Sequence, residues 1–118
     1  MAARKGVKYD GGKERAHLVL TGFSRALLEV AWVGTQGALK YAEDDWLYVE
    51  NGFARYSDAM MRHILKERKS KHDEESGLLH AAHIAWNALA RLELGLRALE
   101  ASGNEKARRC VPPGRTNG

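Results

Sequence analysis

The sequence predicts an all-α protein, folded as a small helical bundle. Two observations carry this prediction: apolar residues recur at helical spacing in three long segments, and no segment shows the apolar–polar alternation of a strand. A chain of 118 residues corresponds to one domain, which buries only a limited part of its surface. Small bundles often complete their core by self-association, so we also expect a homo-oligomer.

The first predicted helix runs from Ser24 to about Tyr41, within the segment SRALLEVAWVGTQGALKYA. Its apolar residues fall three and four positions apart, as on one side of a helix. The next segment, EDDWLYVENG, predicts a connection that holds an acidic cluster and Trp46.

The second and third predicted helices are joined through a polar turn, SKHDEESG. The second runs from Gly52 to about Lys69 and is apolar on more than one side, so we expect neighbours to surround it. The third runs from about Ser76 to Ala101 and ends before a glycine. The folded domain is therefore expected to span residues 16–101.

The net charge of +4 comes from the two ends of the chain. Residues 24–100 contain ten Lys and Arg against twelve Asp and Glu. We expect residues 1–15 to form a flexible basic segment and residues 102–118 a disordered basic tail. Nucleic-acid binding is not expected, because such proteins concentrate basic groups on a folded face. The alternative, DNA binding through the basic ends, predicts strongly salt-dependent affinity that is lost when the ends are removed.

The composition argues against a membrane or secreted protein. No apolar run approaches the roughly 18 residues that suggest a membrane span. The basic N-terminus is not followed by the apolar stretch of a signal peptide. The single cysteine, Cys110, has no partner within the chain. We therefore expect a cytoplasmic protein.

Polar side chains form a narrow stripe along the third predicted helix. At about 100° per residue, one side holds Ser76, His80, His83, Asn87 and Arg91. One interpretation is a face in contact with solvent. The other is a binding site, since solvated faces favour Lys and Glu over the poorer helix formers His and Asn. The two histidines can approach one metal or phosphate, and imidazole with carboxylate suits Zn, Mn or Co rather than Mg.

The second predicted helix offers partners for this stripe. Arg55, Asp58 and Arg62 share a side, so Asp58 can bind a cation while the arginines bind phosphate. The alternative is a surface ion pair. His63 lies about 140° around the helix from Asp58, so the two should not serve one point. If the second and third helices form an antiparallel hairpin, His63 lies at the level of His80. The alternative is that His63 is only a packed histidine of the helix.

A third group of candidates lies in the segment KYAEDDW. Lys40 can contact phosphate, and Tyr41 or Trp46 can stack on a base. The alternative is that these aromatic residues anchor a loop on the core. No nucleotide-binding glycine motif, Ser-His-Asp arrangement or zinc-knuckle spacing accompanies them.

Four segments together resemble a known family. KYDGGKERAHLV, GALKYAEDDW, RYSDAMMRH and ESGLLHAAHIAWNAL are similar in order and spacing to the phage-rich family of dATP/dGTP diphosphohydrolase N-terminal domains, the MazZ-like proteins. The match covers about Val7 to Leu99. The resemblance implies a fold like the MazG-like nucleotide pyrophosphohydrolases. It also implies hydrolysis of dGTP or dATP to the monophosphate and pyrophosphate, in the host-cell cytoplasm if phage-encoded, as part of remodelling the purine deoxynucleotide pool.

The resemblance also implies a cofactor and roles for single residues. The cofactor is a divalent metal, Mg²⁺ first and Mn²⁺ or Co²⁺ next. We expect metal ligands at Asp58, Glu74 and Glu75, and catalytic roles for Glu75, His80 and His83. The substrate-binding residues are expected to be Lys40, Tyr41, Trp46, Arg55, Arg62, His63 and Asn87.

The chain also departs from the related patterns. Asp45 stands where the family has asparagine, and Leu78 stands where MazG-like proteins have the aspartate of their second acidic pair. A second hypothesis is therefore a catalytically silent nucleotide-binding or scaffold protein of the same fold.

Overall fold

The computed structural model describes residues 3–103, and the all-α prediction is confirmed. The elements in chain order are α1 (His17–Leu20), α2 (Ser24–Lys40), the 3-10 helix η1 (Asp45–Tyr48), α3 (Gly52–Glu67) and α4 (His80–Ala101). Within that range the only extended pairing is an isolated bridge between His72 and Leu79. Cys110 and nearly all of the predicted C-terminal tail lie outside the described residues.

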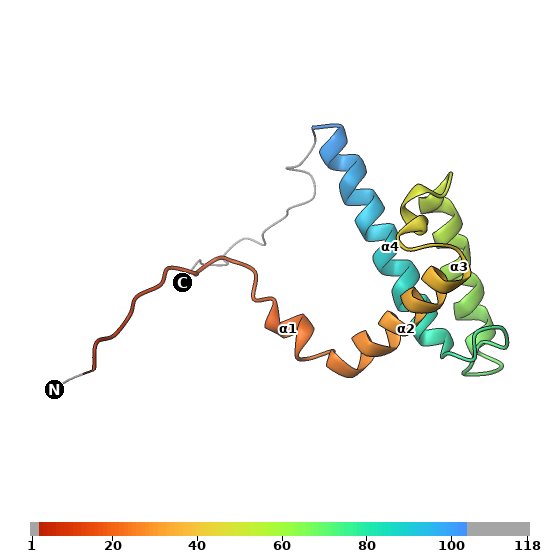
Figure 1. Ribbon diagram of the computed structural model, residues 1–118, viewed down its shortest axis with the longest axis horizontal. Helices are drawn as coiled ribbons and strands as arrows, with labels where there is room; N and C mark the ends of the chain where they lie inside the picture. Colours follow the sequence, from red (N-terminus) through yellow and green to blue (C-terminus); the bar gives the residue numbers. More distant parts are fainter. Residues whose placement is uncertain (1–2, 104–118) are drawn as a thin grey trace.

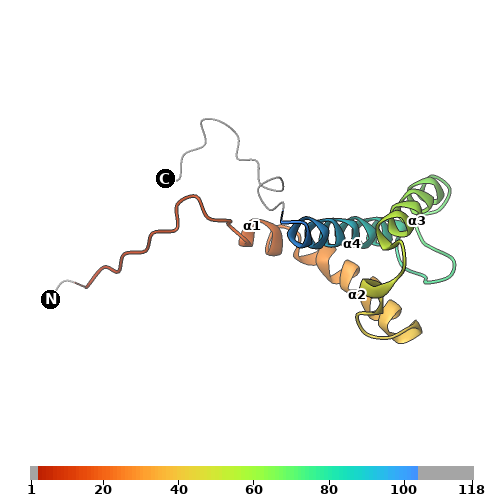
Figure 2. The same cartoon turned by 90° about the horizontal axis from the view of Figure 1, so that it is seen from above.

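Helices α3 and α4 form an antiparallel hairpin that organises the molecule (Figure 1). The C-terminal part of α2 packs across the first turns of α4, while α1 continues away from the hairpin (Figures 1 and 2). Residues 3–15 contain no helix and lead away from the bundle in both views. No helix of the described chain is long and apolar enough to cross a membrane.

Two left-handed residues shape the connection between α2 and α3. Asp44 and Asn51 have φ angles of 58° and 56°, a conformation that Asp and Asn tolerate better than most residues. They lie directly before η1 and directly before α3. The chain therefore turns sharply twice, and η1 carries Trp46 back against the hairpin.

The third helix begins four residues later than predicted, at His80 instead of Ser76. Gly77 has a φ of 74°, outside the range of a right-handed helix, and Leu79 is extended. Asp73 also accepts a hydrogen bond from the backbone N–H of Ser76, which holds the chain in a turn. The α3–α4 turn therefore extends through Leu79.

The core of the described chain is small. Its most buried residues include the apolar Val33, Ala82 and Ala90 and the polar His80 and Asn87. Several large apolar residues are exposed: Leu89 and Leu92 on α4, and Met61, Ile64 and Leu65 on α3. The expectation that neighbours surround α3 is thus wrong for the single chain, because α4, η1 and the turn cover only part of it.

The N-terminal half of α2 also exposes apolar residues. Leu28 and Trp32 lie one turn apart on α2, and both are more than half exposed. Exposed apolar surface of this kind often marks an interface. The homo-oligomer stays a prediction, and α2 is its leading candidate surface.

Candidate functional site

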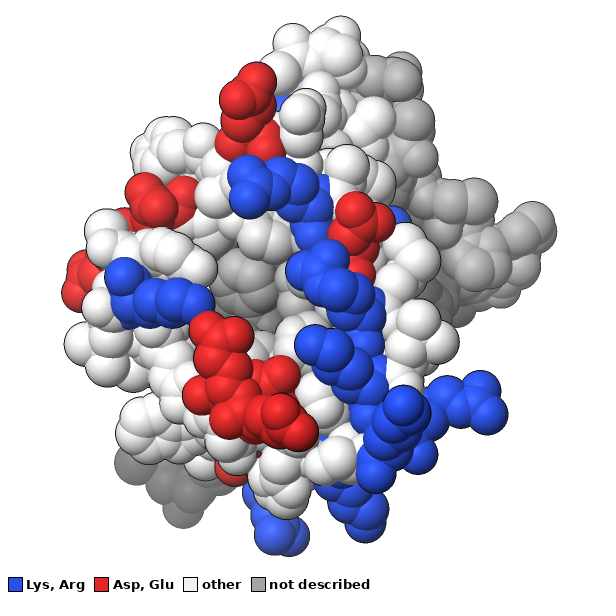
Figure 3. All heavy atoms as spheres, turned by 90° about the vertical axis from the view of Figure 1, so that its right-hand side faces the viewer, with Lys and Arg blue, Asp and Glu red and all other residues white. Residues whose placement is uncertain are grey.

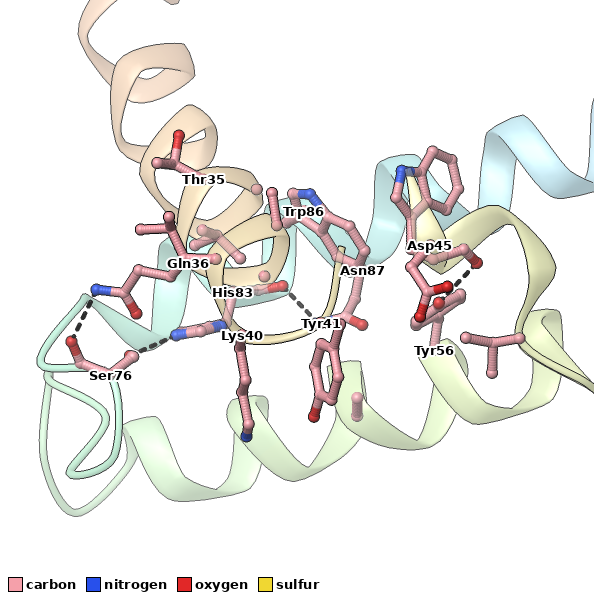
Figure 4. Close-up of a pocket in the computed structure, with 18 of the residues that line it drawn as sticks. Thr35, Gln36, Lys40, Tyr41, Asp45, Tyr56, Ser76, His83, Trp86 and Asn87 are labelled. Atoms are coloured by element: carbon pink, nitrogen blue, oxygen red, sulfur yellow. Dashed lines mark hydrogen bonds between the residues drawn. The ribbon is translucent and has the colours of Figure 1, made fainter. Parts of the chain in front are cut away.

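A cavity of about 1350 Å³ lies between the C-terminal half of α2, the segment after it, one side of α3 and the start of α4. Side chains from these elements surround it, with aromatic groups near η1 and polar groups near the α3–α4 turn (Figure 4). An apolar wall combined with a few convergent polar groups is typical of ligand pockets.

Three basic residues of α3 line the cavity. Arg55, Arg62 and Lys66 are spaced by seven and four residues, which places them on one side of the helix, with the small Ala59 between them. Neither arginine forms an ion pair with a carboxylate of residues 3–103. Lys and Arg side chains form a band on this face of the molecule (Figure 3). These exposed cations can therefore bind an anion in the cavity.

The aromatic end is built from three interlocked rings. Trp86 of α4 makes edge-to-face contacts with Trp46 at 5.6 Å and with Tyr56 at 5.5 Å between ring centroids. The hydroxyl of Tyr56 donates a hydrogen bond of 2.7 Å to the carbonyl of Trp46. Burial raises the pKa of Tyr56, outweighing the charge of Arg55, so the hydroxyl stays protonated at neutral pH. Trp46 therefore anchors its loop on the hairpin, while its predicted contact with a base stays a prediction.

Lys40 and Tyr41 lie on the rim at the end of α2. The Nζ atom of Lys40 is 2.7 Å from Oε1 of Glu75, and it lies 5.2 Å from the ring centroid of Tyr41. The hydrogen bond between Lys40 and Glu75 raises the pKa of the lysine and lowers the pKa of the glutamate. Because both side chains are exposed, this ion pair is weak and can open to admit an anion.

Three histidines, an aspartate and a serine form a connected cluster at the polar end. The Nδ1 atoms of His63 and His80 are 2.9 Å apart. The ring of His83 stacks on that of His63 at 4.4 Å, and its Nε2 lies 2.7 Å from the hydroxyl of Ser76. Asp73 binds the N–H of Ser76 through Oδ2, and its Oδ1 is 4.0 Å from Nδ1 of His63. The cluster therefore joins α3, the turn and α4.

The protonation of this cluster follows from its burial. Burial, together with the neighbouring His83, lowers the pKa of His63 from 6.5 to about 4, against the opposing effect of Asp73. Burial also lowers the pKa of His83. Burial raises the pKa of Asp73, but hydrogen bonds from Ser76 and the nearby histidines lower it further, so the net shift is downward. At neutral pH, neutral His63 and His83 therefore lie beside an ionised carboxylate.

The lowered pKa of His63 predicts that the protein loses stability in mild acid. The unfolded chain takes up a proton near pH 6.5, whereas the folded protein does so only near pH 4. The free energy of unfolding should therefore fall as the pH decreases from about 6.5 to about 4. Urea denaturation at a series of pH values measures this slope. His63→Gln should reduce the dependence of the unfolding free energy on pH, whereas the control His72→Gln, at an exposed position, should not. Equal pH dependence in the wild type and both variants would contradict the attribution to His63.

The structure excludes the first interpretation of the polar stripe, a face in contact with solvent. His80 and Asn87 are only 3% and 5% exposed, so this side of α4 is not a solvated face. Asn87 donates its amide N–H to the carbonyl of His83, and Arg91 hydrogen-bonds the hydroxyl of Ser57 on α3. The stripe faces the interior between the two helices, and His63 lies at the level of His80 as predicted.

The structure brings together most of the predicted substrate and catalytic residues, but not the predicted metal ligands. Asp58 and Glu74 do not line the cavity, and Glu75 lines it while paired with Lys40. Among residues 3–103, the group able to hold a metal ion consists of His63, Asp73 and His80. The predicted residues that line the cavity are Lys40, Tyr41, Trp46, Arg55, Arg62, His63, Glu75, His83 and Asn87. Their individual roles stay predictions.

Sequence reasoning missed Gln36 and Tyr56, and in the acidic run of residues 73–75 it chose Glu74 and Glu75 as metal ligands instead of Asp73. Gln36 donates a hydrogen bond to the carbonyl of Ser76 and so ties α2 to the turn. Asp73 carried a local signal, since Asp ahead of Ser and Gly often hydrogen-bonds its own turn. The direction of its second carboxylate oxygen depends on the fold of residues 71–80 and has no such signal.

Comparison with known proteins identifies the family of this chain. The sequence profile of the family described as "dATP/dGTP diphosphohydrolase, N-terminal" matches residues 3–104. A protein named dATP/dGTP diphosphohydrolase from Salmonella phage PMBT28 is 37% identical over 81 residues. That alignment covers 68% of this chain and 26% of the phage protein, so the chain spans about a quarter of its relative. No solved structure is significantly similar. Since the family profile covers nearly the whole chain, the chain belongs to the dATP/dGTP diphosphohydrolase N-terminal family.

Proposed function

We propose that this chain hydrolyses a purine deoxynucleoside triphosphate, dGTP or dATP, to the monophosphate and pyrophosphate with a divalent metal ion. The observation that carries the proposal is that one cavity joins an aromatic wall to a row of basic side chains. A base and a triphosphate are matched by these two surfaces. In a phage-infected cell such an activity would remodel the purine deoxynucleotide pool. The MazG-like bundle and the homo-oligomer belong to the same proposal.

The base would bind at the aromatic end. Tyr41 is exposed at the rim and Trp46 is partly buried, so both can offer surface to a purine ring. Asn87 uses its amide nitrogen to bind the carbonyl of His83. Its amide oxygen is therefore the atom left to accept a hydrogen bond from a purine amino group.

The triphosphate would lie along α3. Arg55 and Arg62 can each make paired hydrogen bonds to phosphate oxygens, and Lys66 adds a point charge one turn further on. Lys40 faces them from α2 and would exchange Glu75 for phosphate. These four cations position the phosphates next to the histidine cluster, where neutral His83 can accept a proton from an attacking water.

The divalent ion would neutralise charge on the phosphates and activate the attacking water. The carboxylates expected to hold it do not gather at one point, and among residues 3–103 the group able to hold a metal contains two histidines rather than oxygen ligands alone, which Mg²⁺ prefers. Magnesium commonly enters such sites on the substrate phosphates, which needs few protein ligands. The chain's own residues then contribute by binding and orienting the nucleotide.

Pyrophosphate release from a panel of nucleoside triphosphates tests the function. With Mg²⁺, Mn²⁺ or Co²⁺, we expect dGTP or dATP to be consumed, with the monophosphate and pyrophosphate as products. Pyrimidine nucleotides should be consumed more slowly, because they lack the second ring for the aromatic wall. Thermal stabilisation by nucleotides without turnover of any of them would instead identify a silent nucleotide-binding protein.

A further inference from the structure

Three potential metal ligands from separate parts of the hairpin converge at the polar end of the cavity. His63 comes from α3, Asp73 from the turn, and His80 is the first residue of α4. One ligand atom from each lies within 4.8 Å of both others. Such convergence of residues far apart along the chain depends on the packing of the two helices.

The distances suit a single ion. Two ligand atoms bound to one ion at about 2.1 Å, in tetrahedral or octahedral geometry, lie roughly 2.9 to 3.4 Å apart. The Nδ1 atoms of His63 and His80 are 2.9 Å apart, within that range. The Oδ1 atom of Asp73 is 4.0 Å from Nδ1 of His63, so a small rotation of the carboxylate would complete the set.

Neighbouring residues hold these ligands in place. Asp73 binds the N–H of Ser76 through Oδ2, which leaves Oδ1 as the oxygen nearer His63. His83 stacks on His63, and the hydroxyl of Ser76 in turn hydrogen-bonds His83. The backbone N–H of His80 is bound by the carbonyl of Lys71. Supporting contacts of this kind orient metal ligands in known sites.

The group is sheltered, yet it reaches the cavity. His80 is 3% exposed, and the side chains of His63 and Asp73 are 17% and 14% exposed. His63 and Asp73 line the cavity, whereas His80 lies behind them. Catalytic metal sites typically have three protein ligands and an open coordination position on the substrate side, whereas structural sites are closed.

From this geometry we infer that His63, Asp73 and His80 bind one transition-metal ion of the Zn²⁺, Co²⁺ or Mn²⁺ class at the floor of the cavity. Two imidazoles and one carboxylate suit these borderline ions, whereas Mg²⁺ and Ca²⁺ prefer oxygen ligands alone. The inference deepens the proposed function, and only the role of the ion towards the substrate rests on that function. The metal site itself is inferred from the positions of the three side chains.

Metal binding by the full chain, freed of metal with a chelator, tests the inference without any nucleotide. Calorimetric titration should show one Co²⁺ or Zn²⁺ per chain, with a rise in Tm that the same concentration of Mg²⁺ does not give. Bound Co²⁺ should also acquire a visible absorption spectrum distinct from that of the ion in buffer.

Two variants identify the ligands. Asp73→Asn keeps an oxygen that can bind the N–H of Ser76, and His63→Gln keeps a polar side chain. Each should weaken Co²⁺ binding by at least about 100-fold, the upper end of the loss seen for supporting residues. His72→Gln is the matched control, since His72 adjoins Asp73 and is exposed. Circular dichroism confirms that each variant is folded.

The outcomes separate the inference from the proposed function. The inference is overturned if the wild type binds no stoichiometric Co²⁺, or if Asp73→Asn and His63→Gln bind Co²⁺ with unchanged affinity. Either result identifies His63 and His80 as a hydrogen-bonded pair only. Pyrophosphate release with Mg²⁺ in that case leaves the proposed function standing. Tight Co²⁺ binding through these residues without turnover of any nucleotide overturns the function and leaves the metal site.

Discussion

Replacing Arg62 with glutamine is expected to lower kcat/KM for dGTP or dATP by about 100-fold, comparable to the loss of one transition-state hydrogen-bond donor. Arg62 occupies the middle of the basic row on α3, next in sequence to His63, and has no carboxylate partner within residues 3–103. Its guanidinium can therefore bind two phosphate oxygens, and glutamine supplies neither the charge nor the paired donors. Steady-state pyrophosphate release measures the effect.

Two comparisons make this result specific. Arg68→Gln removes the same charge at an exposed position two residues beyond Lys66, outside the cavity, and should leave kcat/KM unchanged. Arg62→Lys should recover part of the activity, because lysine keeps the charge but not the paired geometry. Equal losses in the Arg62 and Arg68 glutamine variants would show only a general effect of net charge. Full activity of Arg62→Gln would exclude α3 as the phosphate-binding surface.

Introducing a charge at Leu28 is expected to dissociate the homo-oligomer. Leu28 and Trp32 expose apolar surface on α2, while the core of the single chain is small. A glutamate buried in an apolar interface should weaken association by at least about 30-fold, or about 2 kcal/mol. Sedimentation at several protein concentrations measures the change for Leu28→Glu, and Tm should fall with it.

Leu65→Glu is the matched control for this experiment. Leu65 is 66% exposed and Leu28 is 67% exposed, so the two substitutions differ in place rather than in burial. Dissociation by Leu65→Glu alone would move the interface to α3. A monomeric wild-type protein at all concentrations would contradict the expected homo-oligomer and leave the apolar side of α2 without this explanation.

The helices were predictable because local periodicity determines them. The apolar spacing from Ser24 onward and from Gly52 onward matches α2 and α3 at their first residues. The third helix was placed too early because the periodicity of SGLLHAAH continues through the turn. Gly77 and the Asp73–Ser76 hydrogen bond end that pattern in three dimensions. Short elements such as η1 contain too few residues to show a period.

The candidate site was predictable only in part. The residues of the polar stripe share one side of α4, so helical geometry alone grouped His83 with Asn87. The predicted metal-binding carboxylates were wrong for this cluster, because the carboxylate that reaches the histidines lies in the turn between α3 and α4. Asp58, on the well-predicted α3, lies off the cavity, whereas Asp73 reaches the histidines through a backbone path that spacing does not encode. The direction of a loop side chain is set by tertiary contacts.

The burial of His80 and Asn87 bears on how proteins of this family can evolve new preferences. Both side chains help to fill the space between α3 and α4. Asn87 lines the cavity and His80 contacts His63, which lines it, so changing either should alter folding and ligand binding together. Lys40 and Tyr41 are exposed on the rim and carry no such double role. Divergence in nucleotide preference should therefore begin at the rim, while the buried pair is retained.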